Sequence, residues 1–207
     1  MRYLALIFLL YLSQSTAFCQ SHQLIDSLAT LLKRLPKEDI KRVPVLIQVS
    51  NHHLTSAPEQ SLLYAREAYS IASKTIQDTL KINSIIALGI AHEYMTKYDS
   101  AMLYYRKALA KSEVINYQLG IVQAYGSIAI CYEMQSNLDS AILLYQKTSS
   151  LSQAYRIPEE AADNLANLAN LLAIKGDLPE ALTYYREAIQ FFSTLKDSTS
   201  LAEMHNG

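Results

Sequence analysis

The residues that could do chemistry recur at a fixed interval. His52 and His92 are 40 positions apart, and so are Glu93 and Glu133. Two imidazoles on neighbouring units could bind a metal ion, and two carboxylates could act as general acid and base. The histidine position continues as Tyr132, however, which is typical of a packing position, and a structural metal site usually needs about four ligands. We expect packing roles for the histidines, solvated groove positions for the glutamates, and no metal or other cofactor.

No other pattern in the sequence predicts catalysis. The chain has no glycine-rich phosphate loop, no Gly-Xaa-Ser-Xaa-Gly elbow and no His-Glu-Xaa-Xaa-His motif. Cys131 stands between apolar and aromatic neighbours, where a lone thiol acts as a small hydrophobic residue. We expect no enzymatic activity from these residues, so that any catalytic domain would lie outside the chain.

A repeat with a period of 40 residues must position these side chains. A short motif that ends in a small residue recurs in register at 58–61, 98–101, 138–141 and 178–181. In the clearest copy Ala101 is followed by Tyr105 and Ala108, and spacings of three and four mark one face of a helix. Each unit is predicted to be two helices of about 15 residues. A fixed period of this kind predicts units that stack to bury a shared core.

The pattern resembles the tetratricopeptide repeat. One copy matches the family's signature at Ile85, Leu88, Gly89, Tyr98, Ala101, Tyr105 and Ala108. A later copy matches it at Leu168, Gly176, Ala181, Tyr185 and Ala188. The resemblance implies an all-α, right-handed helical-repeat solenoid of antiparallel helix pairs. The family's usual period is about 34 residues and its units end in proline, which is absent here, so we expect longer helices that end in looser turns.

The repeat register divides the chain. Residues 20–41 are predicted to form an N-terminal packing helix, and residues 42–197 to form four repeats. The repeats are assigned to 42–81, 82–121, 122–161 and 162–197. Residues 198–207 resemble the start of a truncated fifth repeat, which favours a fragment of a longer protein.

The N-terminus has the layout of a secretory signal peptide. A positive start precedes an apolar run from Tyr3 to Leu12, and small or tolerated cleavage residues follow near Ala17. The run is short for a membrane span. We expect residues 1–19 to be a signal peptide and the product to be exported, periplasmic or associated with the cell envelope. An uncleaved anchor and lipidation at Cys19 are the alternatives.

In the resembled family, the first helices of successive repeats line a ligand-binding groove. Carried onto this sequence, the resemblance implies a groove formed by Ser50, His53, Asn83, Ile86, Ile90, Glu93, Tyr94, Gln123, Ile130, Glu133, Met134, Asp163 and Asn170. These residues include no lysine or arginine, unlike the clamp with which chaperone-binding members hold a carboxylate. Their apolar and acidic character favours an extended or helical peptide with apolar anchors and basic groups.

Several partners and settings follow from these features. The formal net charge is −1 and no basic stripe is present, so nucleic acid is not expected. We expect a protein or peptide partner, or a neighbouring domain of the same polypeptide, and membrane contact only through downstream sequence. A signal peptide before long-period repeats resembles the N-terminal halves of certain bacterial histidine kinases and transcriptional regulators. The resemblance implies an extracytoplasmic sensory or interaction region of a signal-transduction protein. A stand-alone periplasmic or secreted adaptor and the regulatory domain of an enzyme are the alternatives.

Overall fold

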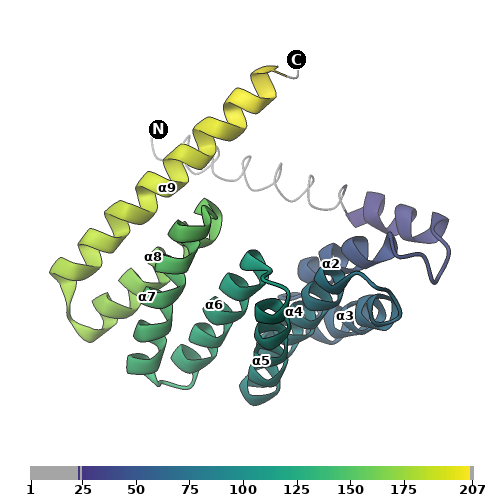
Figure 1. The fold of residues 1–207 in the computed structure, drawn as a ribbon, viewed down its shortest axis with the longest axis horizontal. Helices are drawn as coiled ribbons and strands as arrows, with labels where there is room; N and C mark the ends of the chain where they lie inside the picture. The colour runs from purple at the N-terminus through teal and green to yellow at the C-terminus, as the bar shows by residue number, and fades with distance from the viewer. Residues whose placement is uncertain (1–22, 24, 206–207) are drawn as a thin grey trace, which may run out of the picture.

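The described part of the chain is a stack of helix pairs. The computed structural model describes residue 23 and residues 25–205, with side chains as far as residue 195. The pairs are α2 (Arg42–His52) with α3 (Pro58–Ser73), α4 (Asp78–Tyr94) with α5 (Tyr98–Val114), α6 (Gln118–Met134) with α7 (Leu138–Tyr155), and α8 (Pro158–Lys175) with α9 (Leu178–His205) (Figure 1). Within these residues all regular structure is helical, which confirms the expected all-α solenoid.

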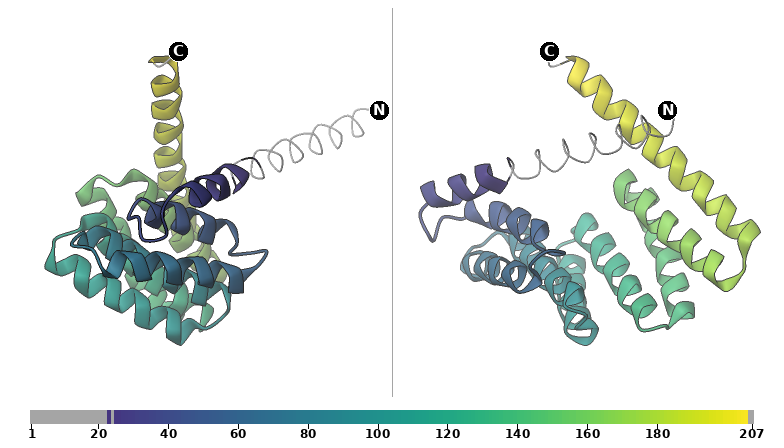
Figure 2. Two further views of the ribbon diagram at one scale, coloured as in Figure 1. Left: turned by 90° about the vertical axis from the view of Figure 1, so that its right-hand side faces the viewer. Right: turned by 180° about the vertical axis from the view of Figure 1, so that it is seen from behind.

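The array curves toward the first helix of each pair. Within the described residues, α2 contacts α4, α4 contacts α6 and α6 contacts α8, whereas no contact joins the second helices of neighbouring pairs. Closer spacing on one side of a stack bends it toward that side. Figures 1 and 2 show the resulting curved array, with α9 extending beyond the other helices. The first helices therefore form the inner layer.

The core is built from the repeating small and aromatic positions. Ala101 and Ala141 are fully buried, and so are the tyrosines four residues after them, Tyr105 and Tyr145. Gly89 makes room for the first of these rings, because a Cβ atom at position 89 would lie 2.4 Å from Cε1 of Tyr105. The expectation that the aromatic residues fill the space beside small ones is confirmed.

The helices end in tight turns, so the expected looser turns are wrong. Five turns place one residue in the left-handed region: Thr96, Asn116, Ser136, Arg156 and Gly176. After α4, the amide of Lys97 donates to the carbonyl of His92, and the amide of Thr96 donates to that of Glu93. This pair of hydrogen bonds is the Schellman motif, which ends a helix without proline. The sequence showed this geometry only at Gly176.

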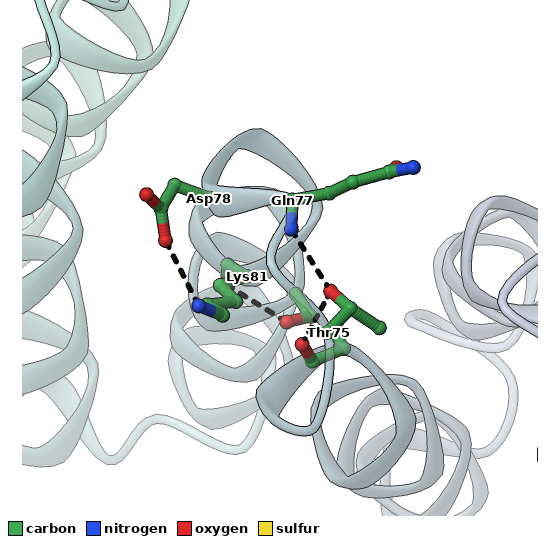
Figure 3. Close-up of polar contacts among 6 residues, drawn as sticks. Thr75, Gln77, Asp78 and Lys81 are labelled. Atoms are coloured by element: carbon green, nitrogen blue, oxygen red, sulfur yellow. Dashed lines mark hydrogen bonds and ion pairs between the residues drawn. The ribbon is translucent and has the colours of Figure 1, made fainter.

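The connection from α3 to α4 is built differently. The hydroxyl of Thr75 donates to the carbonyl of Ala72 and accepts from the amide of Gln77, at 2.9 and 3.2 Å (Figure 3). At the start of α4, Lys81 forms an ion pair with Asp78 at 2.9 Å. Side-chain hydrogen bonds therefore shape this turn in place of a left-handed residue.

The helix before α2 packs on the first pair. Residues 25–34 are helical, and Leu28 is buried against Val45 and Val49. Arg42 is buried, donates to the carbonyls of Leu32 and Leu35 near the end of this helix, and pairs with Glu67 of α3. Arginine donors satisfy the carbonyls that a helix end leaves unpaired. Sequence reasoning did not anticipate this role for Arg42.

The helix bounds differ from the assigned repeat bounds. The first helices begin at Asp78, Gln118 and Pro158, whereas the repeats were assigned from 82, 122 and 162. α9 continues through residue 198 to His205, so no separate fifth helix begins there. No glycine or proline between residues 180 and 205 would interrupt it.

Two further points concern the N-terminus and the membrane. The expected signal peptide, residues 1–19, lies outside the described residues, together with Cys19. Among the residues that the structure describes, no helix combines the length and apolar character that a membrane crossing requires.

Candidate functional site

The inner layer lines a large cavity that is open to solvent, which we call the inner cavity. Its volume is about 620 Å³. From α2 and α4 it is lined by Pro44, Ile47, Gln48, Asn51, Leu80, Asn83, Ile86, Ala87 and Ile90. From α6, its N-cap residue and α8 it is lined by Tyr117, Leu119, Gln123, Gly126, Ser127, Ile130, Glu160, Asp163, Asn164, Ala166 and Asn167. Every helix pair contributes through its first helix, so the cavity crosses the whole stack.

The lining is apolar on α4 and increasingly polar toward α8. Ile86 and Ile90 follow Asn83 along α4, whereas Glu160 and Asp163 lie in the first two turns of α8. Among the described residues, no lysine or arginine lines the inner cavity. An occupant of this site would therefore meet apolar contacts at one end and acidic groups at the other.

The acidic groups are partly desolvated. Burial raises the pKa of Glu160; the hydrogen bond from Gln123 counteracts this, and the nearby charges of Asp163 and Glu159 add to it. Burial also raises the pKa of Asp163. The amide of Gln123 donates to the Glu160 carboxylate at 2.9 Å and so links α6 to α8 across the cavity. A positively charged group beside these carboxylates would offset the cost of desolvating their ionised forms.

Six of the residues expected in the groove line the inner cavity. They are Asn83, Ile86, Ile90, Gln123, Ile130 and Asp163. The first three come from α4, the next two from α6 and the last from α8. The structure therefore brings together the central part of the expected stripe.

Glu93 and Glu133 do not line the inner cavity. The hydroxyl of Tyr105 donates to Glu93 at 2.7 Å, and that of Tyr145 donates to Glu133 at 2.8 Å. Burial raises the pKa of Glu93, an effect opposed by the Tyr105 hydrogen bond. Each carboxylate therefore links the two helices of its pair by a hydrogen bond. Neither occupies the solvated groove position expected for it.

Other expected groove residues also lie elsewhere. Ser50 is fully buried and hydrogen-bonds the hydroxyl of Ser61 at 2.9 Å. His53 stacks on Tyr64 with ring centroids 5.7 Å apart. Tyr94 and Met134 are exposed near the ends of their helices, and Asn170 accepts from the hydroxyl of Tyr185. The C-terminal turns of the first helices therefore face the second helices or solvent.

The histidines and the cysteine have structural surroundings. The ring of His92 stacks on Tyr104 with centroids 5.2 Å apart, as expected for a packing position. His52 is exposed, and its ring contacts the neighbouring ring of His53 in an edge-on arrangement. The packing role expected for His52 is therefore wrong. Cys131 is fully buried; burial, followed by the charges of Glu93 and Asp99, raises its pKa to about 12. The expected hydrophobic role of the thiol is confirmed.

Sequence reasoning missed several cavity residues, of which Glu160 and Asn164 matter most. Asn164 is 4% exposed, and its amide donates to the backbone carbonyl of Glu160 at 2.6 Å. A Cβ atom at Gly126 would lie 2.9 Å from Oδ1 of Asn164, so the glycine lets this amide approach α6. An asparagine among the apolar residues of α8 is the signal that could have identified the position.

Comparisons with known proteins agree with this geometry. Residues 84–113 and 162–192 each match the sequence profile of the tetratricopeptide repeat. The chain contains tetratricopeptide repeats. The matched segments of this repeat protein lie in the second and fourth helix pairs. No curated protein matches the sequence at a significant level.

Solved structures share the fold at low sequence identity. Aspartyl phosphate phosphatase F from Bacillus subtilis has a TM-score of 0.70 and 15% identity, covering 88% of this chain and 48% of that one. A Rap protein complexed with competence and sporulation factor has a TM-score of 0.75 and 16% identity, covering 86% and 51%. The Rap conjugation gene regulator of the plasmid pLS20, in complex with the Phr peptide, has a TM-score of 0.74 and 18% identity, covering 88% and 52%.

The repeat protein therefore spans about half the length of these structures. At such identity the likeness establishes the fold alone.

Proposed function

We propose that this repeat protein binds a protein or peptide segment in the inner cavity. The observation that carries the proposal is a cavity of about 620 Å³ that every first helix lines. Isoleucines on α4 and α6 offer apolar contact, while amides and carboxylates offer hydrogen bonds, which is the mixture that peptide grooves use. A Rap structure with a bound peptide, similar in fold, supports the proposal.

We further propose that the chain is the extracytoplasmic sensory or interaction region of a larger signalling protein. The layout of residues 1–19 and the similarity to part of longer regulators support this setting. We propose that the described residues bind a partner and do not catalyse a reaction. The burial of Cys131 and the rise of its pKa to about 12 support that choice, because a nucleophilic thiol must be exposed and deprotonated.

The test is selection of short linear peptides from a displayed random library. The variant Ala166→Trp fills the inner cavity, because Ala166 lines it and is only half-buried. Ala110→Trp is the matched control, since Ala110 is exposed on α5 outside the cavity. We expect selected peptides to bind the parent protein and the control, and to bind Ala166→Trp at least tenfold more weakly, a loss of about 1.4 kcal/mol. Equal binding to both variants, or no selected peptide, would contradict the proposal.

A further inference from the structure

The polar part of the lining of the inner cavity offers more hydrogen-bond acceptors than the protein satisfies. The Oδ1 atom of Asn83 is buried without a hydrogen-bond partner. Asn164 is more than nine-tenths buried; Nδ2 of its side chain donates to the carbonyl of Glu160, and Oδ1 is the acceptor that the same side chain presents toward Gly126 on α6. The carboxylates of Glu160 and Asp163 add acceptors and negative charge. A buried acceptor without a donor is destabilising, so this part of the cavity favours an occupant that donates.

The repeat register brings these groups to one place. Asn83, Gln123 and Asp163 hold equivalent positions on the successive first helices α4, α6 and α8, and all three line the cavity. Gln123 already donates to Glu160 at 2.9 Å, and Gly126 admits the side chain of Asn164. Acceptors from α4 and α8 therefore line the same cavity.

We infer that this polar part of the inner cavity binds a guanidinium group, supplied by an arginine of the bound segment. This inference rests on the proposed function and specifies its ligand. A guanidinium carries five N–H donors in a plane, so one group can serve several acceptors at once. It is also weakly hydrated, which suits a half-buried site, and the lining holds no lysine or arginine that would repel it.

The experiment uses arginine amide as the probe and citrulline amide as its uncharged isostere. Nuclear magnetic resonance would follow the side-chain amide signals of Gln123 and Asn164 during titration of each compound into the protein. We expect arginine amide to shift both signals in a saturable manner and citrulline amide to shift them at least tenfold less. Equal shifts from the two compounds, or no shift from either, would overturn the inference.

Two variants separate recognition from helix stability. Glu160 is the third residue of α8 and Glu180 is the third residue of α9, which begins at Leu178 outside the cavity. Both carboxylates favour their helix N-terminus. We expect Glu160→Gln to weaken arginine amide binding at least tenfold and Glu180→Gln to leave it unchanged. If the two variants lowered thermal stability alike and left probe binding intact, Glu160 would serve α8 only and the inference would be wrong.

The proposed function can fail separately from this inference. Library peptides that bind in the cavity but contain no arginine, and that bind Glu160→Gln normally, would retain peptide binding and reject the guanidinium site. Arginine amide binding without any selected peptide would retain the site and reject peptide binding.

Discussion

At the scale of single residues, the hydrogen bond between a tyrosine and a carboxylate is the repeating polar feature of the core. Tyr105 and Tyr145 are fully buried, and each donates to a glutamate of the preceding helix. In the last pair Ala173 occupies the glutamate position, and the hydroxyl of Tyr185 donates instead to Asn170, three residues earlier. The hydroxyl of the half-buried Tyr185 therefore also has an acceptor on the first helix of its pair.

Substitutions at Glu93 should separate the hydrogen bond from the charge. Glu93→Gln keeps an oxygen that accepts from Tyr105, whereas Glu93→Lys leaves the buried hydroxyl without one. We expect Glu93→Lys to lower the free energy of unfolding by about 1–3 kcal/mol and Glu93→Gln to lower it much less. Urea denaturation measures both, and equal losses would show that the Tyr105 bond contributes nothing.

The same glutamate should give a pH dependence. Burial raises the pKa of Glu93 above its ordinary value of 4.5, so the folded state binds this proton more tightly than the unfolded state. The stability that the bound proton contributes is present at low pH and is lost as pH rises through the raised pKa. Thermal midpoints of wild type and Glu93→Gln should therefore diverge in favour of the variant as pH rises above 4.5. A constant difference across that range would contradict this account.

At the scale of elements, turn geometry replaces the helix-ending proline of the resembled family. Thr96, Ser136 and Arg156 adopt φ values of 58°, 61° and 58°, where a side chain is strained. Gly176, at 93°, meets the same need without strain. The hydrogen bonds of each turn hold the residue there despite its local preference.

Replacing a strained turn residue should stabilise the fold. Thr96 is β-branched, the type least suited to positive φ. We expect Thr96→Gly to raise the free energy of unfolding by about 1 kcal/mol, because the left-handed conformation costs an L-residue about that much. Gly176→Ala is the reciprocal variant and should lower it by a similar amount. Chemical denaturation of both would test the account, which fails if the two effects have the same sign.

At the scale of the whole molecule, the fold is a chain of local contacts. Within the described residues α2 to α9, each helix contacts the helices directly before and after it, and the first helices also contact the neighbouring first helices. Stability in such an array is a sum over units and their interfaces. A defect in one unit should therefore affect its neighbours more than distant units.

Ala141→Glu tests this locality. Ala141 is fully buried in α7, so a glutamate there overpacks the core and buries an unpaired charge, at a cost of a few (about 2–4) kcal/mol. Hydrogen exchange followed by mass spectrometry should show faster exchange in α6–α9 than in α2 and α3. Ala110→Glu, at an exposed position of α5, is the control. Uniform acceleration in every helix would indicate a single cooperative unit, and an unchanged thermal midpoint would contradict the repeat register.

The sequence alone determined the helices and their shared core. Small residues at Ala101 and Ala141 and aromatics at Tyr105 and Tyr145 have the spacing of one helix face, and all four are buried. Gly176 likewise predicted the left-handed turn that ends α8. These features could be predicted because helix periodicity and turn conformation are set by neighbours along the chain.

Only the tertiary structure decided which polar groups face the inner cavity. Glu93 has the sequence position of a groove residue. Its carboxylate instead accepts a hydrogen bond from the hydroxyl of Tyr105 on α5, within the helix pair. Asn164 falls among buried residues of α8, yet it lines the cavity because Gly126 on the facing helix leaves space for it. In each case the deciding partner lies on another helix, and spacing within one helix carries no information about that partner.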